Sequence, residues 1–215
     1  MLIGFALQKE RIGYKEEQSI LQYCIINNIP YKFCKTKSDA PLDFIPIGSV
    51  EWCEEFLPKN NTIPDYYPKF LSSYLCRKVW RTNEWPKNRV FIKPADHFKK
   101  FTGFISEGEI KGCDGEFWCS DVVNFLNEWR YYISNGKILA AEWYNGIDDE
   151  VEAPLIDIKF SSNYCAAIDF GMLDTGQIAL VEAHLPYACG WYGKNYKIYA
   201  EWVVSGWNYL HNVEK

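Results

Sequence analysis

The stretch that decides the fold reads YCAAIDFGMLDTGQIALVEAH and covers residues 164–184. Two mostly apolar runs flank the turn Leu173-Asp-Thr-Gly176, which is typical of a β-hairpin. In a simple two-stranded register, Asp169 and Glu182 lie opposite or diagonal to each other on one face. His184 follows Glu182 by two residues and shares that face. The stretch therefore predicts a hairpin with two carboxylates and an imidazole on one side.

A cation between the two carboxylates is the functional interpretation of this hairpin. Two like charges this close raise each other's pKa unless a cation intervenes. Mg²⁺ favours carboxylate oxygens and is commonly shared with substrate phosphates, so it is the cation that we expect. The residues alone leave an alternative open, in which Asp169 and Glu182 face solvent or pair with a lysine.

The opening of the chain predicts a β-α-β unit. Residues 2–7 read as a strand, 15–27 as an amphipathic helix, and 29–33 as a second strand. This order favours a parallel pair of strands with a crossover helix. Ser49 is a suitable N-cap for a helix over 50–57.

Two further helices and a series of short strands complete the expected order of elements. Apolar residues at helical spacing predict helices over 66–80 and 196–210. Short strands are expected at 90–93, 103–105, 116–118, 129–134, 137–143, 164–170 and 177–183. Asn135-Gly136 is a strong hairpin turn signal, and the acidic stretch 146–157 is expected to be a solvated loop.

These elements predict an α/β fold with α+β character in its second half. The expected boundary lies near residue 86, within Trp85-Pro-Lys-Asn88. Residues 1–86 would form an N-terminal α/β domain, and residues 87–215 a domain built on antiparallel sheet. A length of 215 residues suits one or two domains.

Composition and charge narrow the class of protein. With 48% hydrophobic and 24% charged residues, the chain has an ordinary globular composition. The net charge of −5 argues against broad binding of nucleic acid or membrane. Residues 77–100 nevertheless carry eight basic and two acidic residues. That run is either a solvated face or a local positive field for phosphates.

The cysteines and the apolar runs point to an intracellular protein. None of the eight cysteines belongs to a C-x-x-C pair, so the usual zinc and thiol-redox spacings are missing. No apolar run approaches the length of about 18 residues that a membrane span needs. The first seven residues are too short for a secretory signal. We expect a cytoplasmic protein with reduced, mostly buried thiols.

The common nucleotide motifs are missing from the sequence. Neither G-x-x-x-x-G-K-[ST] nor G-x-G-x-x-G occurs, which excludes P-loop and Rossmann phosphate sites. Asp169-Phe-Gly171 matches the magnesium motif of protein kinases. No H-R-D catalytic loop precedes it and no glycine-rich loop opens the chain, so a kinase fold is excluded.

Other residues could bind phosphate without those motifs. Lys93 ends the apolar run Val90-Phe-Ile-Lys93, where it is either a phosphate ligand or a solvated edge charge. Lys99-Lys-Phe-Thr-Gly103 can bring two cations and a backbone N–H to a phosphate. Glu128 and Arg130 alternate onto one strand face. Arg130 either clamps a phosphate or carboxylate, or forms a cross-strand salt bridge with a glutamate.

The order of these segments resembles the ATP-grasp superfamily. The segments that carry the resemblance are 91–94, 99–103, 119–123, 128–133, 168–171 and 181–184. The chain is most similar to a small clade from phages and bacteria that is associated with RNA-repair gene sets. Members of this clade also carry a segment like Ile45-Pro-Ile-Gly-Ser-Val50 and a Tyr-Gly pair like Tyr192-Gly193. The resemblance implies an ATP-grasp-like fold in which the second half holds the nucleotide.

The resemblance also implies roles for individual residues. Lys93 would contact the nucleotide phosphates, assisted by Lys99 or Lys100. Ser120, Asp121, Val122 and Glu128 would contribute to the ATP pocket, Arg130 would face the γ-phosphate or the acyl-phosphate, and Asp169 and Glu182 would hold Mg²⁺. Many ATP-grasp enzymes have asparagine two residues after the metal-binding glutamate, where this chain has His184. Imidazole is a poorer Mg²⁺ ligand than an amide oxygen, so His184 would position substrate, act as a base or favour Mn²⁺.

The implied activity is ATP- and Mg²⁺-dependent ligation of a carboxylate to an amine, or a similar nucleophile, through an acyl-phosphate. The substrate could be a small molecule, a peptide or an RNA end. One alternative is ATP-dependent modification or repair of an RNA or protein end, which the basic run permits and the net charge disfavours. A second alternative is a non-catalytic binding module, which His184 favours. The joint presence of Lys93, Arg130, Asp169 and Glu182 counts against that module.

Overall fold

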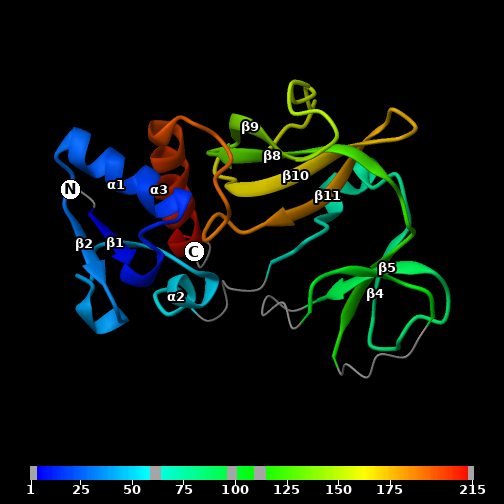
Figure 1. The fold of residues 1–215 in the computed structure, drawn as a ribbon, viewed down its shortest axis with the longest axis horizontal. Coiled ribbons are helices and arrows are strands. Elements are labelled where there is room, and N and C mark those ends of the chain that lie inside the picture. The colour runs from blue at the N-terminus through cyan, green and yellow to red at the C-terminus, as the bar shows by residue number, and fades with distance from the viewer. Residues whose placement is uncertain (1–3, 59–63, 96–100, 109–114, 213–215) are drawn as a thin grey trace.

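The computed structural model describes residues 4–58, 64–95, 101–108 and 115–212. Its elements form three sheets and three α-helices (Figure 1). Two expected phosphate ligands, Lys99 and Lys100, lie outside the described residues. Among the described residues, no helix is long and apolar enough to cross a membrane.

The N-terminal unit is the β-α-β arrangement that the sequence predicts, with one more strand. Strands β1 (Phe5–Gln8), β2 (Tyr31–Cys34) and β3 (Ile45–Ile47) form a parallel sheet in the order β2-β1-β3. Helix α1 (Lys15–Asn27) is the crossover between β1 and β2. Short 3₁₀ helices at Lys9–Arg11 and Lys37–Asp39 follow β1 and β2.

Local capping sets the ends of the N-terminal helices. Helix α1 ends at Asn28, whose left-handed backbone (φ 54°) directs its N–H to the carbonyl of Cys24. Helix α2 (Val50–Glu54) begins at Ser49, whose side chain accepts a hydrogen bond from the backbone of Trp52. The predicted N-cap is therefore confirmed, and the helix is shorter than the expected 50–57.

A four-stranded antiparallel sheet follows. It has the order β4-β7-β5-β6, with β4 (Val79–Thr82), β5 (Val90–Pro94), β6 (Phe104–Ser106) and β7 (Phe117–Ser120). We call it the small sheet. The expected boundary near residue 86 falls between β4 and β5, which are strands of this one sheet.

The predicted helix over 66–80 is wrong. The structure has a 3₁₀ helix at Lys69–Tyr74 and then β4. Cys76 adopts a left-handed conformation (φ 49°), which ends the helical path. Residues 79–82 pair with β7, so tertiary pairing overrides the helical spacing of the apolar residues.

The second antiparallel sheet has longer strands and carries the decisive hairpin. Its order is β11-β10-β8-β9, with β8 (Phe125–Ser134), β9 (Lys137–Gly146), β10 (Ala166–Leu173) and β11 (Ile178–His184). We call it the large sheet. The turn between β8 and β9 has positive φ at Asn135 (48°) and Gly136 (72°), as the Asn-Gly signal predicts. No regular element is assigned over 147–157, which agrees with the expected loop.

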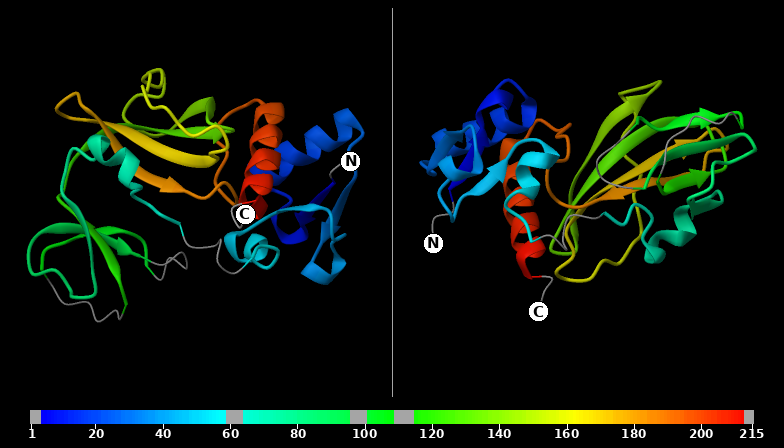
Figure 2. Two further views of the ribbon diagram at one scale, coloured as in Figure 1. Left: turned by 180° about the vertical axis from the view of Figure 1, so that it is seen from behind. Right: turned by 90° about the horizontal axis from the view of Figure 1, so that it is seen from below.

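Helix α3 (Tyr196–Asn212) joins the N-terminal unit to the large sheet. It lies between them in both views of Figure 2, and it packs against α1 and β8. One buried cluster combines Phe5 and Leu7 of β1, Tyr132 of β8, and Trp202 of α3. The indole N–H of Trp202 donates to the carbonyl of Ala166 in β10 (3.1 Å). The last helix thus completes the core of the first unit.

Candidate functional site

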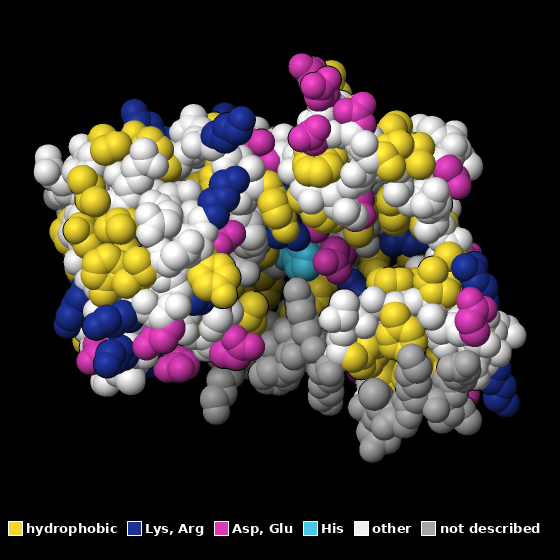
Figure 3. Space-filling model, in the orientation of Figure 1, with side chains coloured by type: hydrophobic (Ala, Val, Ile, Leu, Met, Phe, Trp, Pro, Cys, Tyr) yellow, Lys and Arg dark blue, Asp and Glu magenta, His cyan; other side chains and the backbone are white. Residues whose placement is uncertain are grey.

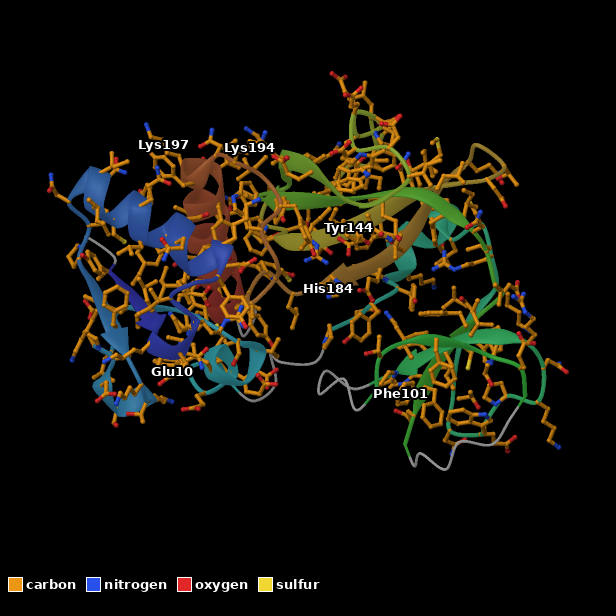
Figure 4. The ribbon with its side chains drawn as sticks, in the orientation of Figure 1. Glu10, Phe101, Tyr144, His184, Lys194 and Lys197 are labelled. Atoms are coloured by element: carbon orange, nitrogen blue, oxygen red, sulfur yellow. The ribbon has the colours of Figure 1, made fainter. Side chains whose placement is uncertain are left out.

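The predicted residues meet where the small sheet faces the large sheet. Figure 3 shows this region as a hollow with a histidine at its centre, and Figure 4 labels that residue as His184. The large sheet supplies Arg130 from β8, Asp169 from β10, and Glu182 and His184 from β11. The small sheet supplies Lys93 from β5. Two sheets are therefore needed to assemble the site.

The register of the decisive hairpin agrees with the prediction. Asp169 lies directly opposite Glu182 across β10 and β11. The next pair is Phe170 with Leu180, so Val181 is an extra residue on β11 and forms a bulge. Bulges re-aim neighbouring side chains, and this one adjoins Glu182.

Arg130 is held by Asp169. Its Nε and Nη2 atoms donate to the two carboxylate oxygens of Asp169, each at 2.7 Å. Of the alternatives that the sequence left open, the glutamate of the same strand is engaged elsewhere. Glu128 accepts hydrogen bonds from the Tyr144 hydroxyl (2.7 Å) and from Asn145 Nδ2 (2.6 Å). Arg130 is thereby fixed, with its guanidinium near the centre of the site.

Lys93 bridges the two sheets. Its ammonium contacts the Glu182 carboxylate, so the lysine pairing that the sequence left open is present. The same ammonium lies 3.9 Å from the ring centre of Tyr66 and 4.9 Å from that of Tyr67. Lys93 is only 9% exposed, which excludes the solvated edge charge. A buried lysine with flexible rotamers between a carboxylate and two rings can turn to an incoming phosphate.

His184 points its Nε2 atom at both carboxylates. This atom is 2.8 Å from Glu182 Oε1 and 3.7 Å from Asp169 Oδ2. Neither contact has hydrogen-bond geometry, so Nε2 is a buried polar atom without a hydrogen-bond partner among the described residues. The ring of Tyr66 packs edge-to-face against the imidazole, with 5.8 Å between ring centres.

The charges of the site shift one another's pKa values. Burial alone would raise the pKa of Asp169, but the charge of Arg130 and its hydrogen bonds outweigh burial and lower it. Burial likewise opposes ionisation of Glu182, yet His184 and Lys93 hold its pKa well below the usual range. Burial would lower the pKa of His184, and the charges of Glu182 and Asp169 raise it instead. Both carboxylates are therefore ionised at neutral pH, as metal ligands must be.

The cluster fits a divalent cation. One ligand atom from each of Asp169, Glu182 and His184 lies within 4.8 Å of the others. The unpartnered Nε2 of His184 is an available donor that points into this cluster. Two carboxylates suit Mg²⁺, and a third ligand that is imidazole moves the preference toward Mn²⁺.

A cavity of about 350 Å³ extends from this cluster between the two sheets. Its lining includes Lys93 and Glu182 as well as four residues expected at the ATP pocket: Ser120, Asp121, Val122 and Glu128. The Asp121 carboxylate accepts a hydrogen bond from the backbone N–H of Lys78 (3.0 Å), which fixes the segment after β7. We call this space the inter-sheet cavity.

Sequence reasoning missed three residues that shape the site. Arg77 lines the inter-sheet cavity and donates to the carbonyls of Leu180 (2.7 Å) and Val181 (3.2 Å) at the bulge. Tyr66 packs on Lys93 and His184, and Tyr144 binds Glu128. Arg77 stood in the basic run, which was the available signal. Nothing in the sequence marked the two tyrosines.

A second cavity of about 230 Å³ lies on the other side of Glu182, toward the N-terminal unit. Arg130, Glu182 and His184 line it together with Tyr66 and Tyr192. The Arg130 guanidinium lies 5.3 Å from the ring centre of Tyr192. We call this space the Arg130 cavity. It shares Glu182 with the inter-sheet cavity, so the two cavities meet at the carboxylate cluster.

Solved structures with a similar fold include two N5-carboxyaminoimidazole synthetases. The enzyme from Staphylococcus aureus aligns with a TM-score of 0.52 and 11% identity, over 95% of this chain and 77% of that one. The Thermotoga maritima ribonucleotide synthetase aligns with a TM-score of 0.50 and 12% identity, over 94% and 75%. At this identity the likeness concerns the fold.

A third alignment is shorter. The ATP-grasp ligase PsnB, complexed with minimal precursor, aligns with a TM-score of 0.38 and 10% identity, over 60% of this chain and 55% of that chain. No protein with a curated description matches the chain.

The sequence itself matches a family model over residues 71–202, which is more than half of the chain. The model describes an ATP-grasp domain and is the second family of its clade. The matched segment contains β4 to β11, and with them Lys93, Arg130 and the carboxylate cluster. The chain therefore belongs to this ATP-grasp domain family.

Proposed function

We propose that the protein is an ATP- and Mg²⁺-dependent ligase that joins a carboxylate to an amine, or to a similar nucleophile, through an acyl-phosphate. The observation that carries this proposal is the meeting of two cavities at Glu182, with a cation on each side. Lys93 lies in the inter-sheet cavity, and Arg130 lies in the second cavity. A transferred phosphoryl group placed between them would be bound from both sides, and catalysis of this kind depends mainly on positioning and charge.

The inter-sheet cavity is the proposed ATP site. The segment Ser120-Asp-Val122 and Glu128 would bind the base and ribose, and Lys93 would turn from Glu182 to the phosphates. Asp169, Glu182 and His184 would hold the metal ion, which when bound neutralises negative charge on the phosphates. Lys99 and Lys100 are proposed as further phosphate ligands.

The Arg130 cavity is the proposed site of the carboxylate substrate. The guanidinium of Arg130 is oriented by its two hydrogen bonds to Asp169, so it presents a fixed cation to an incoming carboxylate. Tyr66 and Tyr192 line the same cavity and would limit access of water to the acyl-phosphate. The second step is displacement of phosphate by the amine.

Thermal unfolding with and without ATP and Mg²⁺ tests the proposed ATP site. Saturation at a hundredfold excess over Kd stabilises a protein by about 2.7 kcal/mol, which gives a measurable rise in Tm. We expect this rise to require both ATP and metal, and to be lost in Asp169→Asn and Glu182→Gln. Glu107→Gln is the matched control, because Glu107 is exposed on the small sheet and pairs with Arg89.

Absence of any shift in the wild-type protein at millimolar ATP would contradict the proposal. If the shift is found, ADP release in the presence of pools of carboxylates and amines identifies the substrates. Turnover that requires a carboxylate alone, with no amine, would point to the transfer of phosphate rather than ligation.

A further inference from the structure

A third cavity of about 660 Å³ lies beyond His184. It is bounded by Asp65, Lys69 and Phe70 around the start of the 3₁₀ helix, by Tyr164 and Cys165 just before β10, and by Tyr209 of α3. It shares His184 and Leu185 with the Arg130 cavity. The three cavities therefore form a continuous series that passes Glu182 and then His184.

Aromatic rings make the walls of this third cavity, which we call the aromatic groove. Phe70 and Tyr164 meet nearly at right angles, with 5.4 Å between ring centres. Tyr164 and Tyr209 meet at 73° with 6.1 Å between centres. Phe160 stacks in parallel on Tyr164 and fixes its orientation. Phe70 is 51% exposed, which is unusual for a ring that only fills a core.

The charges at the groove favour a cation over an anion. Burial raises the pKa of the Tyr164 hydroxyl, and the negative charge of Asp65 raises it further, so the field of Asp65 reaches the wall of the groove. Rings arranged as walls attract cations to their faces. Lys69, the other charged residue of the rim, is exposed, and water screens its charge.

The three cavities differ in the charge that each would accept. Lys93 and Arg77 line the inter-sheet cavity, which suits phosphates. Arg130 lines the second cavity, which suits a carboxylate. The aromatic groove combines ring faces with the carboxylate of Asp65 and mostly apolar walls, and it opens at His184. An amine with an apolar chain or ring is the substrate of the proposed reaction that matches this third environment.

We propose that the aromatic groove binds the amine substrate, holding its cationic group against Phe70, Tyr164 and Tyr209 and directing the molecule toward His184. This inference rests on the proposed ligase function and names the place and chemical class of the second substrate. For ligation the ammonium first loses a proton to water. Its nitrogen lone pair then forms the C–N bond, the C–O bond to phosphate breaks, and phosphate leaves with that electron pair while the second N–H proton passes to it or to water.

Direct binding of a simple amine tests the proposal. The probe is n-hexylamine, titrated into the ¹⁵N-labelled full chain and followed by the amide shifts of residues 164–166 and 209. 1-Hexanol, which has the same chain without the charge, is the matched ligand. We expect hexylamine to bind about tenfold more tightly than hexanol, because the rings and Asp65 act on the charge.

Variants assign the binding to the groove. Phe70→Ala is expected to weaken hexylamine binding about tenfold, and Asp65→Asn several-fold, as a lost ring face and a lost charge would. Lys69→Met is expected to leave binding unchanged or strengthen it. Leu155→Ala removes a fully exposed apolar side chain of the 147–157 loop and is the control for general surface hydrophobicity.

Several results would overturn the inference. Equal affinity for hexylamine and hexanol would make the groove a neutral apolar site. Binding that survives Phe70→Ala would place the amine elsewhere. A short single-stranded RNA that shifts the same amides and resists displacement by hexylamine would assign the groove to RNA.

The same samples distinguish this inference from the proposed function. ATP and Mg²⁺ are titrated into each variant, and Phe70→Ala is expected to keep the wild-type thermal shift. Amine binding without any ATP response would retain the groove and reject the ligase. An ATP response without amine binding would do the reverse.

Discussion

His184 is the residue whose chemistry departs most from its neighbours in the site. Its imidazole lies between two carboxylates and a tyrosine ring, and its Nε2 atom has no hydrogen-bond partner among the described residues. The proton on this ring stabilises the folded state through Glu182 and Asp169. The same position would have to release that proton for Nε2 to bind a metal.

Stability is predicted to depend on pH through His184. Its pKa is raised in the folded protein, so its contribution is fully present below the unfolded value of about 6.5 and is lost as pH rises through the folded pKa. Both carboxylates stay ionised in that window because their pKa values are lowered. Urea unfolding of wild type and His184→Gln is expected to differ most in mildly acid solution and least in alkaline solution. A difference that grows with pH would contradict this account.

At the scale of elements, the bulge in β11 determines where Glu182 points. Val181 is the extra residue, and a bulge leaves local backbone groups without ladder partners. Arg77, which precedes β4, donates to the carbonyls of Leu180, Val181 and Leu75. One side chain therefore ties the segment before the small sheet to the strand that carries Glu182.

Loss of Arg77 is predicted to affect both stability and metal binding. Arg77→Met leaves buried carbonyls without donors, which costs about 1–3 kcal/mol. It also frees the bulge, so affinity for Mn²⁺, measured by electron paramagnetic resonance, is expected to fall about tenfold, as for lost positioning residues around metal ligands. Arg77→Lys should be intermediate. Arg89→Met is the control, because Arg89 pairs with Glu107 on the surface. Unchanged Mn²⁺ affinity in a destabilised Arg77→Met would limit Arg77 to a structural role.

At the scale of the whole molecule, α3 makes the N-terminal unit and the large sheet one packing unit. Trp202 is fully buried, packs edge-to-face on Tyr132 of β8, and donates to Ala166 of β10. Ala166 lies three residues before Asp169 on the same strand. The core of the first unit is thus continuous with the strand that carries a proposed metal ligand.

Trp202→Ala is predicted to destabilise both units together. A large aromatic removed from a core costs about 3–5 kcal/mol, whereas Trp202→Phe should cost less because it keeps most of the packing. Far-UV circular dichroism and tryptophan fluorescence should report one shared unfolding transition. Ile147→Ala, at an exposed position, is the control. A shift of one transition with the other unchanged would show that the two units unfold independently.

Family membership confirms the expected ATP-grasp fold and the expected class of enzyme, an ATP-dependent ligase of the ATP-grasp type. It leaves the substrates and the individual roles of Lys93, Arg130 and His184 to the experiments described above.

Local patterns in the sequence were sufficient for the parts of this protein that depend on neighbours along the chain. The β-α-β opening, the Ser49 cap, the Asn135-Gly136 turn and the Asp169–Glu182 register were all predicted correctly. Alternation along a strand and the chemistry of caps and turns act over a few residues. A single sequence therefore contains the information that these features require.

Contacts between distant segments were decided only by the tertiary structure. The apolar spacing of 66–80 favoured a helix, yet pairing with β7 made its end a strand. Lys93 could be predicted as a candidate, but its contacts with Glu182 and Tyr66 depend on how the small sheet faces the large one. The bulge clasp of Arg77 and the aromatic groove likewise join segments about a hundred residues apart. Such contacts arise from packing between sheets and helices, and spacing along the chain carries no record of them.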